Sequence, residues 1–279
     1  MTNEVMREYW NSDAGRTWAR MQERMDATLT PVTAELLGAA APAPGEHVLD
    51  IGCGSGETTL ALAAAVGPEG EVLGVDISAL LLEVAEARAE ALESDADFIE
   101  ADASTLPGEG DRDLIISRFG VMFFDDPVAA FTNIHTHAAP GGRLHFACWR
   151  TPAENDWAML ALRAVGHLLP PSPQADPLAP GPFAFADPER LRGILTAAGW
   201  HDVVIAPFDF LMPVGTGADP VADAVKFSTK IGPAAKAIRE AGEAVQDAAR
   251  AALAKAYAPY ADGEVVGLPA AIWLVSAQA

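Results

Sequence analysis

The chain has 279 residues, of which half are hydrophobic and 20% are charged. Its 18 Lys and Arg residues stand against 39 Asp and Glu residues, which gives a formal net charge of −21. Binding to nucleic acids and to anionic membrane surfaces depends on Lys and Arg, so this charge disfavours both kinds of partner. The apolar content argues against a disordered chain and suits one large α/β domain, or one domain with a sizeable insertion.

Two cysteines, Cys53 and Cys148, are too few for a disulfide scaffold or a cysteine-based zinc site. His135 and His137 lie two positions apart on a predicted helix and would face different directions, so no metal site is predicted. The first eight residues mix charges without an apolar run, and no stretch approaches the roughly 20 apolar residues of a membrane span. We therefore expect a cytoplasmic protein.

Short β-type runs alternate with helical patterns in the first half of the chain, which is typical of βαβ units around a parallel sheet. Five strands are expected in this half, at residues 47–51, 72–76, 97–100, 114–117 and 143–149. Two more strands are expected at residues 203–214 and 271–277. The sequence therefore predicts a seven-stranded α/β fold.

Helix signals lie between these runs. Ser78 precedes a segment in which leucines and alanines recur at helical spacing as far as residue 92. Asp126 and Asp187 are each followed by proline, which is the pattern of a helix N-cap and first helical position. These signals predict helices over residues 78–92 and 128–136, and a third that starts after Asp187 and stops at Gly199.

The most informative stretch begins at Val48, where an apolar strand leads into glycines at positions 52, 54 and 56 and then into a helix. Glycines let the backbone approach a ligand closely and adopt positive φ angles. A dinucleotide-binding fingerprint would need glycine at position 57, where this chain has Glu57. Glu57 and Asp50 would repel a pyrophosphate, and both carboxylates instead suit a cofactor that carries positive charge.

Two further carboxylates follow neighbouring strands. Asp76 ends the second strand, where an acidic residue can accept hydrogen bonds from both hydroxyls of a ribose. Asp102 follows the third strand, where a carboxylate can accept from an exocyclic amine such as that of adenine. Ligands of open α/β sheets bind at the carboxyl ends of the strands, so Asp50, Asp76 and Asp102 are expected to share one site.

Residues 48–56, 74–78, 101–103 and 117–124 resemble the ordered motifs of class I S-adenosylmethionine-dependent methyltransferases, of the methyltransferase type 11 or UbiE-like group. The resemblance covers residues 10–150 closely and the remainder in outline. It implies a Rossmann-like sheet of order 3-2-1-4-5-7-6 with one antiparallel strand and helices on both faces. The seven expected strands agree with this sheet.

The resemblance also implies an organisation in three parts. Residues 1–40 would form N-terminal cap helices, and residues 41–150 the Rossmann-like core that binds the cofactor. Residues 151–279 would form the C-terminal part of the core. This last part contains a proline-rich stretch at 168–182, expected to be a surface loop, and an alanine-rich stretch at 219–259, expected to be a helical cap or insertion.

The resemblance implies S-adenosyl-L-methionine as the cofactor and S-adenosyl-L-homocysteine as its product. Gly52 and Gly54 would lie against the methionine part of the cofactor. Asp50 would order the loop or reach the methionine ammonium through water. Ser117 or Arg118 would flank the methionine carboxylate.

On the nucleoside side, the resemblance implies that Asp76 binds the ribose and that Ile77 packs on adenine. Asp102 and Ala103 would hold the adenine amine. The expected cofactor-binding set is Trp18, Asp50, Gly52, Cys53, Gly54, Ser55, Asp76, Ile77, Asp102, Ala103, Ser117 and Arg118.

Trp18 lies in a segment, residues 9–18, that is similar to a short N-terminal motif of these enzymes in which an aromatic side chain covers the cofactor. Trp18 stands where tyrosine is more usual. An aromatic face beside a sulfonium is electrostatically favourable. Packing within the N-terminal helices is the alternative role.

Candidates for the acceptor side follow the fourth and fifth strands. Phe123, Trp149 and Trp157 would form an apolar wall, and Arg118 or Arg150 would hold a substrate carboxylate. Ordinary packing or solvated charge is the alternative for each. The Arg-Asn-Val motif that quinone-methylating members carry after the fourth strand is absent, so that substrate is not supported.

Methyl transfer is an in-line displacement in which the protein chiefly aligns the nucleophile and excludes water. A general base is needed only where the acceptor must lose a proton before attack, and no catalytic residue is assigned. The predicted function is methyl transfer to N or O of a small-molecule metabolite. The alternatives are methylation of a peptide, a natural-product peptide or a protein, and a non-catalytic scaffold that binds the cofactor. The sequence leaves open a monomer or a homodimer.

Overall fold

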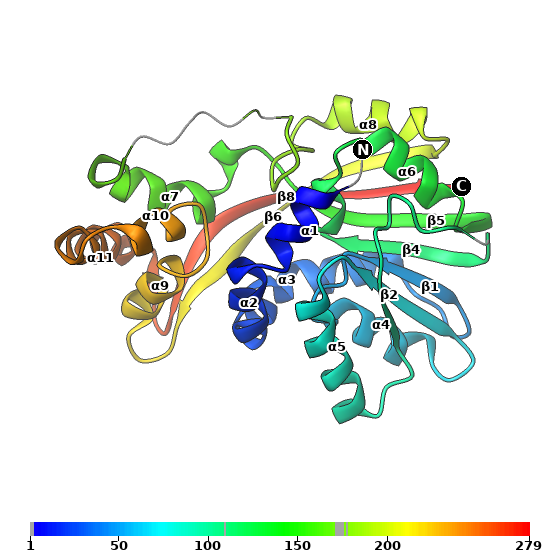
Figure 1. Ribbon diagram of the computed structural model, residues 1–279, viewed down its shortest axis with the longest axis horizontal. Helices are drawn as coiled ribbons and strands as arrows, with labels where there is room; N and C mark the ends of the chain where they lie inside the picture. The colour runs from blue at the N-terminus through cyan, green and yellow to red at the C-terminus, as the bar shows by residue number, and fades with distance from the viewer. Residues whose placement is uncertain (1–2, 109, 171–175, 177) are drawn as a thin grey trace. The chain divides into compact units, whose positions relative to one another are not determined.

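The computed structural model describes residues 3–108, 110–170, 176 and 178–279. The described part of the chain forms a mixed, eight-stranded sheet surrounded by helices (Figure 1). The chain divides into two compact units. The first comprises Met1–Trp149, Pro177–Phe208 and Ile272–Ala279, and the second comprises Arg150–Asp176 and Asp209–Ala271.

The strands follow the order β3-β2-β1-β4-β5-β8-β6, as expected, with β8 in the place of the predicted seventh strand. β1 runs parallel to β2 and to β4, and β8 runs antiparallel to β5. The strands on this path are β1 (His47–Ile51), β2 (Glu71–Asp76), β3 (Asp97–Glu100), β4 (Arg112–Arg118), β5 (Ala138–Trp149), β6 (His201–Thr216) and β8 (Val265–Gln278).

Burial explains the apolar runs in the central strands. The side chains from Leu114 to Ile116 of β4 are fully buried, as is Val48 of β1. A parallel strand with helices on both faces has no solvent side, so its sequence is a continuous apolar run rather than an alternation.

The expected count of seven strands is corrected to eight in the described part of the chain. The additional strand, β7 (Ala261–Asp262), pairs antiparallel with the start of β8 in a hairpin that turns at Gly263 with φ +56°. A two-residue strand has no periodicity that sequence patterns could reveal. β8 also begins at Val265, before the expected residue 271.

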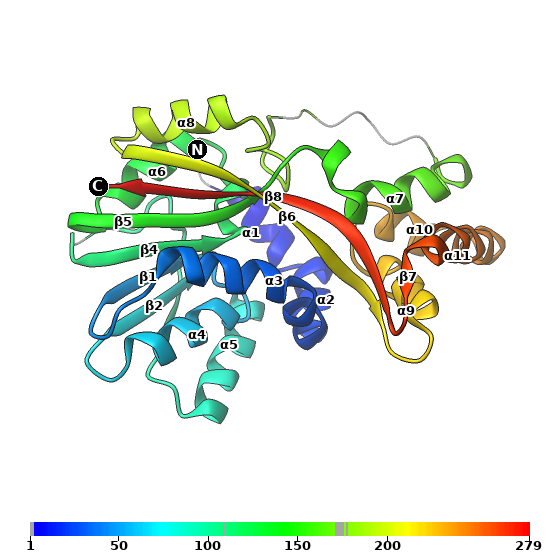
Figure 2. The ribbon, with the colours of Figure 1, turned by 180° about the vertical axis from the view of Figure 1, so that it is seen from behind.

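Helices cover both faces of the sheet in the first unit. α3 (Gln22–Ala40) and α4 (Glu57–Val66) lie across one face, which is turned toward the viewer in Figure 2. α6 (Pro127–His135) and α8 (Pro188–Ala197) lie on the other face (Figure 1). The first unit also contains α1 (Glu4–Trp10), α2 (Asp13–Arg20), α5 (Ala79–Leu92) and the short 3-10 helix η1 (Gly120–Phe123).

The two predicted helix caps, Asp126 and Asp187, are confirmed, and the structure adds a third at Ser78. The Ser78 hydroxyl accepts from the backbone N–H of Leu81 at the start of α5. Asp126 and Asp187 cap α6 and α8 in the same way, each followed by proline at the first helical position. These local signals therefore fix where three of the helices begin.

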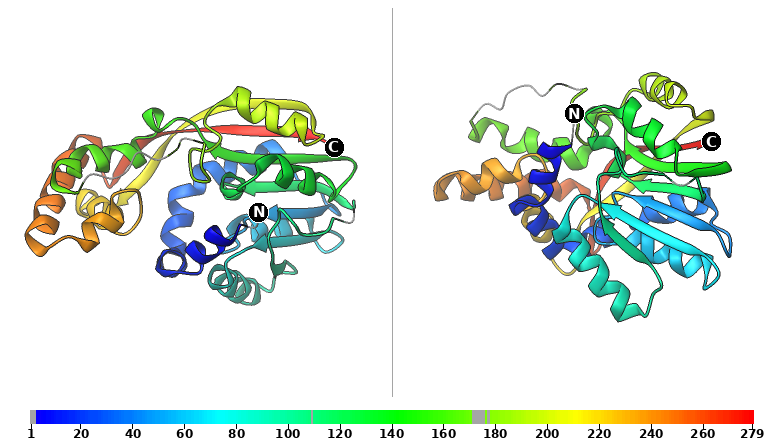
Figure 3. Two further views of the ribbon diagram at one scale, coloured as in Figure 1. Left: turned by 45° about the horizontal axis from the view of Figure 1, so that its top comes forward. Right: turned by 45° about the vertical axis from the view of Figure 1, so that its right-hand side comes forward.

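The second unit is largely helical, and Figure 3 shows its helices α9, α10 and α11, coloured yellow to orange, gathered together. Of the proline-rich stretch at 168–182, residues 171–175 and 177 lie outside the described residues. No helix of the described residues is both long and apolar enough to cross a membrane.

The second unit contains β7 and parts of β6 and β8. Its helices are η2 (Pro152–Glu154), α7 (Asp156–Val165), η3 (Gly166–Leu168), α9 (Pro220–Ser228), α10 (Ala235–Glu240), α11 (Glu243–Tyr257) and η4 (Ala258–Tyr260).

Asn155, just before α7, is a fully buried polar side chain that holds the second unit together. Its Nδ2 donates to the carbonyls of Thr151 and Ala271, both at 3.0 Å. Its Oδ1 accepts from the backbone N–H of Ala271 at 3.0 Å and from the Trp157 indole at 3.1 Å. The carboxamide therefore joins segments that are far apart in the sequence.

We expect Asn155→Ala to lower the free energy of unfolding by about 3 kcal/mol, because it removes several buried hydrogen bonds at once and strands their partners. Asn133→Ala is the matched control, since among the described residues the Asn133 side chain donates to two carbonyls, those of Ala103 and Leu106. Its expected cost is about 1 to 2 kcal/mol. Urea unfolding of the three proteins measures both values, and a cost below that of the control for Asn155→Ala would contradict its role.

Candidate functional site

The carboxyl ends of three parallel strands bring the predicted carboxylates to one edge of the sheet. Asp50 lies in β1 opposite Gly74 of β2, and Asp76 ends β2 opposite Glu100 of β3. Asp102 follows two residues after β3. The polypeptide thus presents three carboxylates in the order of the strands, at the edge where open α/β sheets bind ligands.

The glycine loop after β1 folds back on the neighbouring strand. The backbone N–H groups of Gly52 and Cys53 both donate to the carbonyl of Val75, at 2.8 and 3.2 Å. Gly52 has φ +66°, and a Cβ atom there would lie 2.6 Å from the Cα of Gly120. The fold of the loop and its contact with the turn after β4 therefore both require glycine at position 52.

Asp76 ties the glycine loop to the end of β2. Its Oδ2 accepts from the backbone N–H of Gly54 at 2.8 Å, and its Oδ1 accepts from that of Ser78 at 2.9 Å. Burial raises the pKa of Asp76, and the backbone hydrogen bonds from Ser78, Gly54 and Ile77 oppose that rise. Each carboxylate oxygen has a further acceptor position for a ligand.

Asp50 is a buried carboxylate with one oxygen unsatisfied. Its Oδ2 accepts from the Thr59 hydroxyl at 2.7 Å, while Oδ1 has no hydrogen-bond partner among the described residues. Burial raises the pKa of Asp50 to about 6, against the lowering effects of Thr59 and of the Arg118 charge. A buried acceptor without a donor costs free energy, so a positive group or a water with a free proton would be stabilised there.

Asp102 is held on one side by the protein itself. Its Oδ1 accepts from the backbone N–H of Ser104 at 2.9 Å and from the Ser104 hydroxyl at 2.6 Å. A third donor is the side chain of Asn3, a residue that sequence reasoning did not single out. The neighbouring Ala103 is buried, and its carbonyl accepts from Asn133.

Ser117 and Arg118 leave β4 in different environments. Ser117 is fully buried, and its hydroxyl donates to the carbonyl of Ile51 at 2.7 Å and accepts from the N–H of Gly120 at 3.1 Å. It therefore fixes the contact between the turn after β4 and the glycine loop. Arg118 turns toward α3 and α4, where its Nη1 donates to Glu57 and, at 2.6 Å, to the Thr33 hydroxyl.

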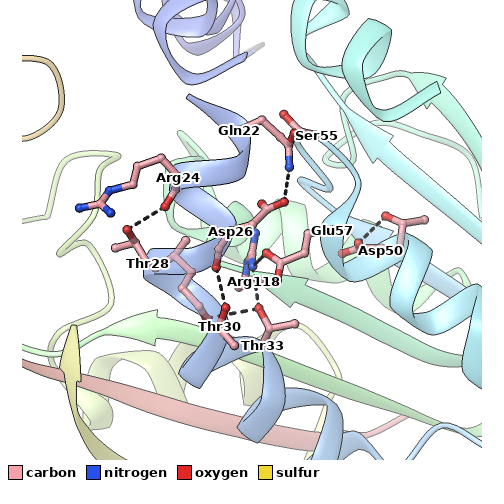
Figure 4. Close-up of polar contacts among 12 residues, drawn as sticks. Gln22, Arg24, Asp26, Thr28, Thr30, Thr33, Asp50, Ser55, Glu57 and Arg118 are labelled. Atoms are coloured by element: carbon pink, nitrogen blue, oxygen red, sulfur yellow. Dashed lines mark hydrogen bonds and ion pairs between the residues drawn. The ribbon is translucent and has the colours of Figure 1, made fainter. Parts of the chain in front are cut away.

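Arg118 is part of a charged network between the N-terminal helix α3 and the glycine loop (Figure 4). Asp26 of α3 accepts from Gln22 and, at 2.8 Å, from Arg88 of α5. Arg88 also donates to the carbonyl of Ser55 in the loop. Burial raises the pKa of Glu57, while Arg118 lowers it and Asp26 raises it further. The network balances two carboxylates against two guanidinium groups.

Glu57, which was expected to repel a pyrophosphate, is paired with a cation. The structure places its carboxylate against the Arg118 guanidinium, so Glu57 is not an isolated negative charge beside the glycine loop. The two residues are 61 positions apart, so no local pattern could indicate the pair. Asp50 differs from Glu57 in having a buried oxygen without a hydrogen-bond partner among the described residues.

Aromatic side chains lie beside this edge of the sheet. Trp10 makes edge-to-face contacts with Trp18, at 5.5 Å between ring centroids, and with Phe123, at 5.7 Å. The Ser78 hydroxyl donates to the carbonyl of Trp10 at 2.8 Å, which attaches α1 to the end of β2. Trp10 therefore contacts two of the predicted site residues, Trp18 and Phe123.

Phe119 directly follows β4 and was not predicted as a site residue. Its ring stacks on Trp149 at the end of β5, with 4.3 Å between centroids and 4° between planes. Its φ of +68° is rare for a bulky residue, and such strained positions cluster at functional sites. Phe119 carries no sequence signal for this conformation, because the usual residues there are Gly and Asn.

Arg150 and Trp157 belong to the second unit and have partners within it. Arg150 pairs with Glu154 and, at 2.7 Å, with Asp209. The Trp157 indole donates to Asn155.

The two cysteines, Cys53 and Cys148, are both buried. Burial raises the pKa of each thiol, which favours the inert, protonated form.

The sequence of this chain is similar to those of known methyltransferases. Residues 48–142 match a family described as a methyltransferase domain. Aklanonic acid methyltransferase DauC of Streptomyces sp. (strain C5) is 38% identical over 119 residues, which are 42% of this chain and 54% of that protein. This chain thus spans about half the length of DauC. Demethylmenaquinone methyltransferase of Staphylococcus carnosus (strain TM300) is 30% identical over 174 residues, 59% of this chain and 71% of that protein.

A solved structure supports the fold. Magnesium protoporphyrin IX methyltransferase (ChlM) from Synechocystis PCC 6803, with bound S-adenosylhomocysteine, superposes with a TM-score of 0.54 at 21% identity, covering 75% of this chain and 92% of that one. The strand order, the glycine loop and the sequence matches agree with one another. The chain belongs to the class I S-adenosylmethionine-dependent methyltransferases, whose cofactor is S-adenosyl-L-methionine.

Proposed function

We propose that the protein transfers the methyl group of S-adenosylmethionine to a nitrogen or oxygen atom of a small-molecule metabolite. The observation that carries this proposal is the buried Asp50, whose unsatisfied Oδ1 lies in the strand that leads into the glycine loop. A cofactor with an ammonium and a sulfonium satisfies such a group, whereas a pyrophosphate would be repelled.

The nucleoside would lie along the ends of β2 and β3. Asp76 would accept from the two ribose hydroxyls with the lone pairs that Gly54 and Ser78 leave available. Ile77 would pack on adenine, and Asp102 with Ala103 would hold the adenine amine. The carboxylates of Asp76 and Asp102 already accept hydrogen bonds from backbone N–H groups, so little ordering of these two side chains is needed on binding.

The methionine end would lie against the loop that carries Gly52, Cys53, Gly54 and Ser55. Asp50 would accept from the ammonium, directly or through a water molecule. Arg118 would offer the carboxylate its remaining N–H groups, because its Nη1 is already engaged by Glu57 and Thr33. Ser117 would act indirectly, since its hydroxyl is taken by Ile51 and Gly120.

When bound, S-adenosylmethionine supplies an electrophilic methyl group on a positively charged sulfur. The protein's part is to align the acceptor with that methyl and to exclude water. We propose Phe123 and Trp149 for the apolar side of the acceptor site, with Trp18 covering the cofactor. Arg150 and Trp157 remain proposals for the acceptor side, and Arg150 would have to exchange Glu154 or Asp209 for an anionic acceptor.

Support for a small-molecule acceptor comes from charge and from the relatives. The net charge of −21 disfavours nucleic acid and other polyanions. The names of two relatives, aklanonic acid methyltransferase and demethylmenaquinone methyltransferase, refer to methylation of small molecules. The Arg-Asn-Val motif of quinone-methylating members is absent from this chain, so we do not propose the quinone itself.

We expect Asp76→Ala to weaken binding of S-adenosylhomocysteine by about 1.5 to 3 kcal/mol, because hydrogen bonds to a charged acceptor are lost. Asp113→Ala is the matched control, since Asp113 also accepts from a backbone N–H, that of His47 at the opposite end of β1. Isothermal titration calorimetry measures both affinities. Equal affinities for wild type and Asp76→Ala would refute the ribose assignment.

The raised pKa of Asp50 predicts a pH dependence of cofactor binding. Below about pH 6 the carboxyl is protonated and offers no charge to the ammonium. As pH rises through 6 the carboxylate forms, so affinity for S-adenosylhomocysteine should rise by up to about tenfold per pH unit and level off above about pH 7. Calorimetry across this range should show the rise in wild type and a much flatter profile in Asp50→Asn. Identical profiles would show that Asp50 does not face the ammonium.

Methyl transfer to an acceptor tests the function itself. The protein is incubated with methyl-labelled S-adenosylmethionine and cell lysate, and the label is then measured in the small-molecule and macromolecular fractions. We expect label in the small-molecule fraction, reduced in Asp76→Ala at a cofactor concentration that does not saturate the variant. Label confined to the macromolecular fraction would favour a peptide or protein acceptor, and binding of S-adenosylhomocysteine without transfer to either fraction would favour a scaffold.

A further inference from the structure

Asn3 is a buried polar residue whose side chain serves a distant part of the fold. It stands at the N-cap position of α1 and is 7% exposed, yet its side chain makes no capping bond to that helix. Asparagine is among the preferred caps because its oxygen can accept from the first turn of the helix. In this chain the Asn3 carboxamide binds residues outside α1 and leaves the first turn of that helix without a side-chain cap.

Both ends of the Asn3 carboxamide bind residues near the ends of other strands. Its Nδ2 donates to Oδ1 of Asp102 at 3.0 Å. Its Oδ1 accepts from the backbone N–H of Asp125 at 3.1 Å. One buried side chain therefore bridges the loop after β3 and the loop that follows η1, both of which border the proposed cofactor site.

The contacts of Asp102 are one-sided. Oδ1 receives the Asn3 amide, the Ser104 N–H and the Ser104 hydroxyl. Within the described part of the chain, no donor is bonded to Oδ2. Three donors on one oxygen hold the carboxylate in a single orientation and leave the other oxygen as the acceptor for a ligand. Ser104 belongs to the same loop as Asp102, so Asn3 is the donor that fixes this orientation relative to the rest of the site.

We propose that Asn3 is a positioning residue that turns Oδ2 of Asp102 toward the exocyclic amine of adenine. This role rests on the proposed function, in which Asp102 holds that amine. An oriented carboxylate accepts from an amine and repels a carbonyl oxygen in the same place, so Asn3 sets the preference for adenine over hypoxanthine. Asn3 lies outside the matched region, residues 48–142, so this selectivity would come from the N-terminal segment.

The test compares two ligands that differ in the exocyclic group of the base and in the proton on the adjacent ring nitrogen. S-adenosylhomocysteine carries the amine, and S-inosylhomocysteine carries a carbonyl oxygen in its place. Their dissociation constants are measured by calorimetry at neutral pH, with any affinity tag at the carboxyl end of the chain. We expect wild type to bind the adenine ligand more tightly. The selectivity ratio is the dissociation constant of S-inosylhomocysteine divided by that of S-adenosylhomocysteine. Asn3→Ala should reduce this ratio by about 5- to 10-fold, mainly by weakening the binding of S-adenosylhomocysteine.

Two further variants separate positioning from mere anchoring of α1. Asn3→Asp keeps the shape of the side chain but faces Asp102 with a like charge, so the ratio should fall further than in Asn3→Ala. Asn11→Ala removes the bond from Asn11 to the carbonyl of Ile77, which anchors the end of the same helix. It should weaken both ligands by a similar factor and leave their ratio unchanged.

The outcomes are distinguishable. An unchanged ratio in Asn3→Ala, whether both ligands weaken equally or neither weakens, overturns the role of Asn3 and leaves the proposed function standing. A wild-type protein that binds neither ligand contradicts the proposed function together with the role of Asn3. A reduced ratio in Asn3→Ala with an unchanged ratio in Asn11→Ala supports the inference.

Discussion

The close approach of two backbone turns is the constraint on which the site depends. A Cβ atom on Gly52 would collide with Gly120, and one on Gly120 would lie 2.5 Å from the carbonyl of Ile51. The Ser117 hydroxyl bonds to both sides of this contact. Because the turns after β1 and β4 touch, the residues on either side of them have fixed directions: Asp50 is buried beneath the loop, and Phe119 takes a positive φ.

The net charge of −21 does not describe the surroundings of the glycine loop, where two carboxylates are paired with guanidinium groups. Asp26 and Glu57 are matched by Arg88 and Arg118 between α3, α5 and β4, so the region beside the glycine loop contains balanced ion pairs. Asp50 differs because one of its oxygens has no donor among the described residues. Burying a carboxylate that remains unpaired is costly, and a cationic ligand offsets that cost. The excess of acids over bases therefore disfavours polyanionic partners, whereas the single buried carboxylate of Asp50 favours a cofactor with a positive charge.

The sequence predicted those parts of the molecule that depend on local patterns. The strands follow from apolar runs, and the helix caps at Asp126 and Asp187 follow from capping residues before proline. The strand order was implied by the family resemblance, which rests on the glycine loop and the strand-end carboxylates. The pairing of Glu57 with Arg118 and the bridge from Asn3 to Asp102 were missed, because each joins residues far apart in sequence. The backbone of Phe119 was missed for a different reason: its strain is imposed by the turn, whereas its residue type is typical of packing.

The strand-end carboxylates of this chain are proposed to hold the cofactor, and a crystal structure of the protein with S-adenosylhomocysteine would show whether they do. We expect both ribose hydroxyls within about 3 Å of the Asp76 carboxylate and the adenine amine at a similar distance from Oδ2 of Asp102. A nucleoside bound away from these two carboxylates, or with its ribose turned away from Asp76, would refute both assignments.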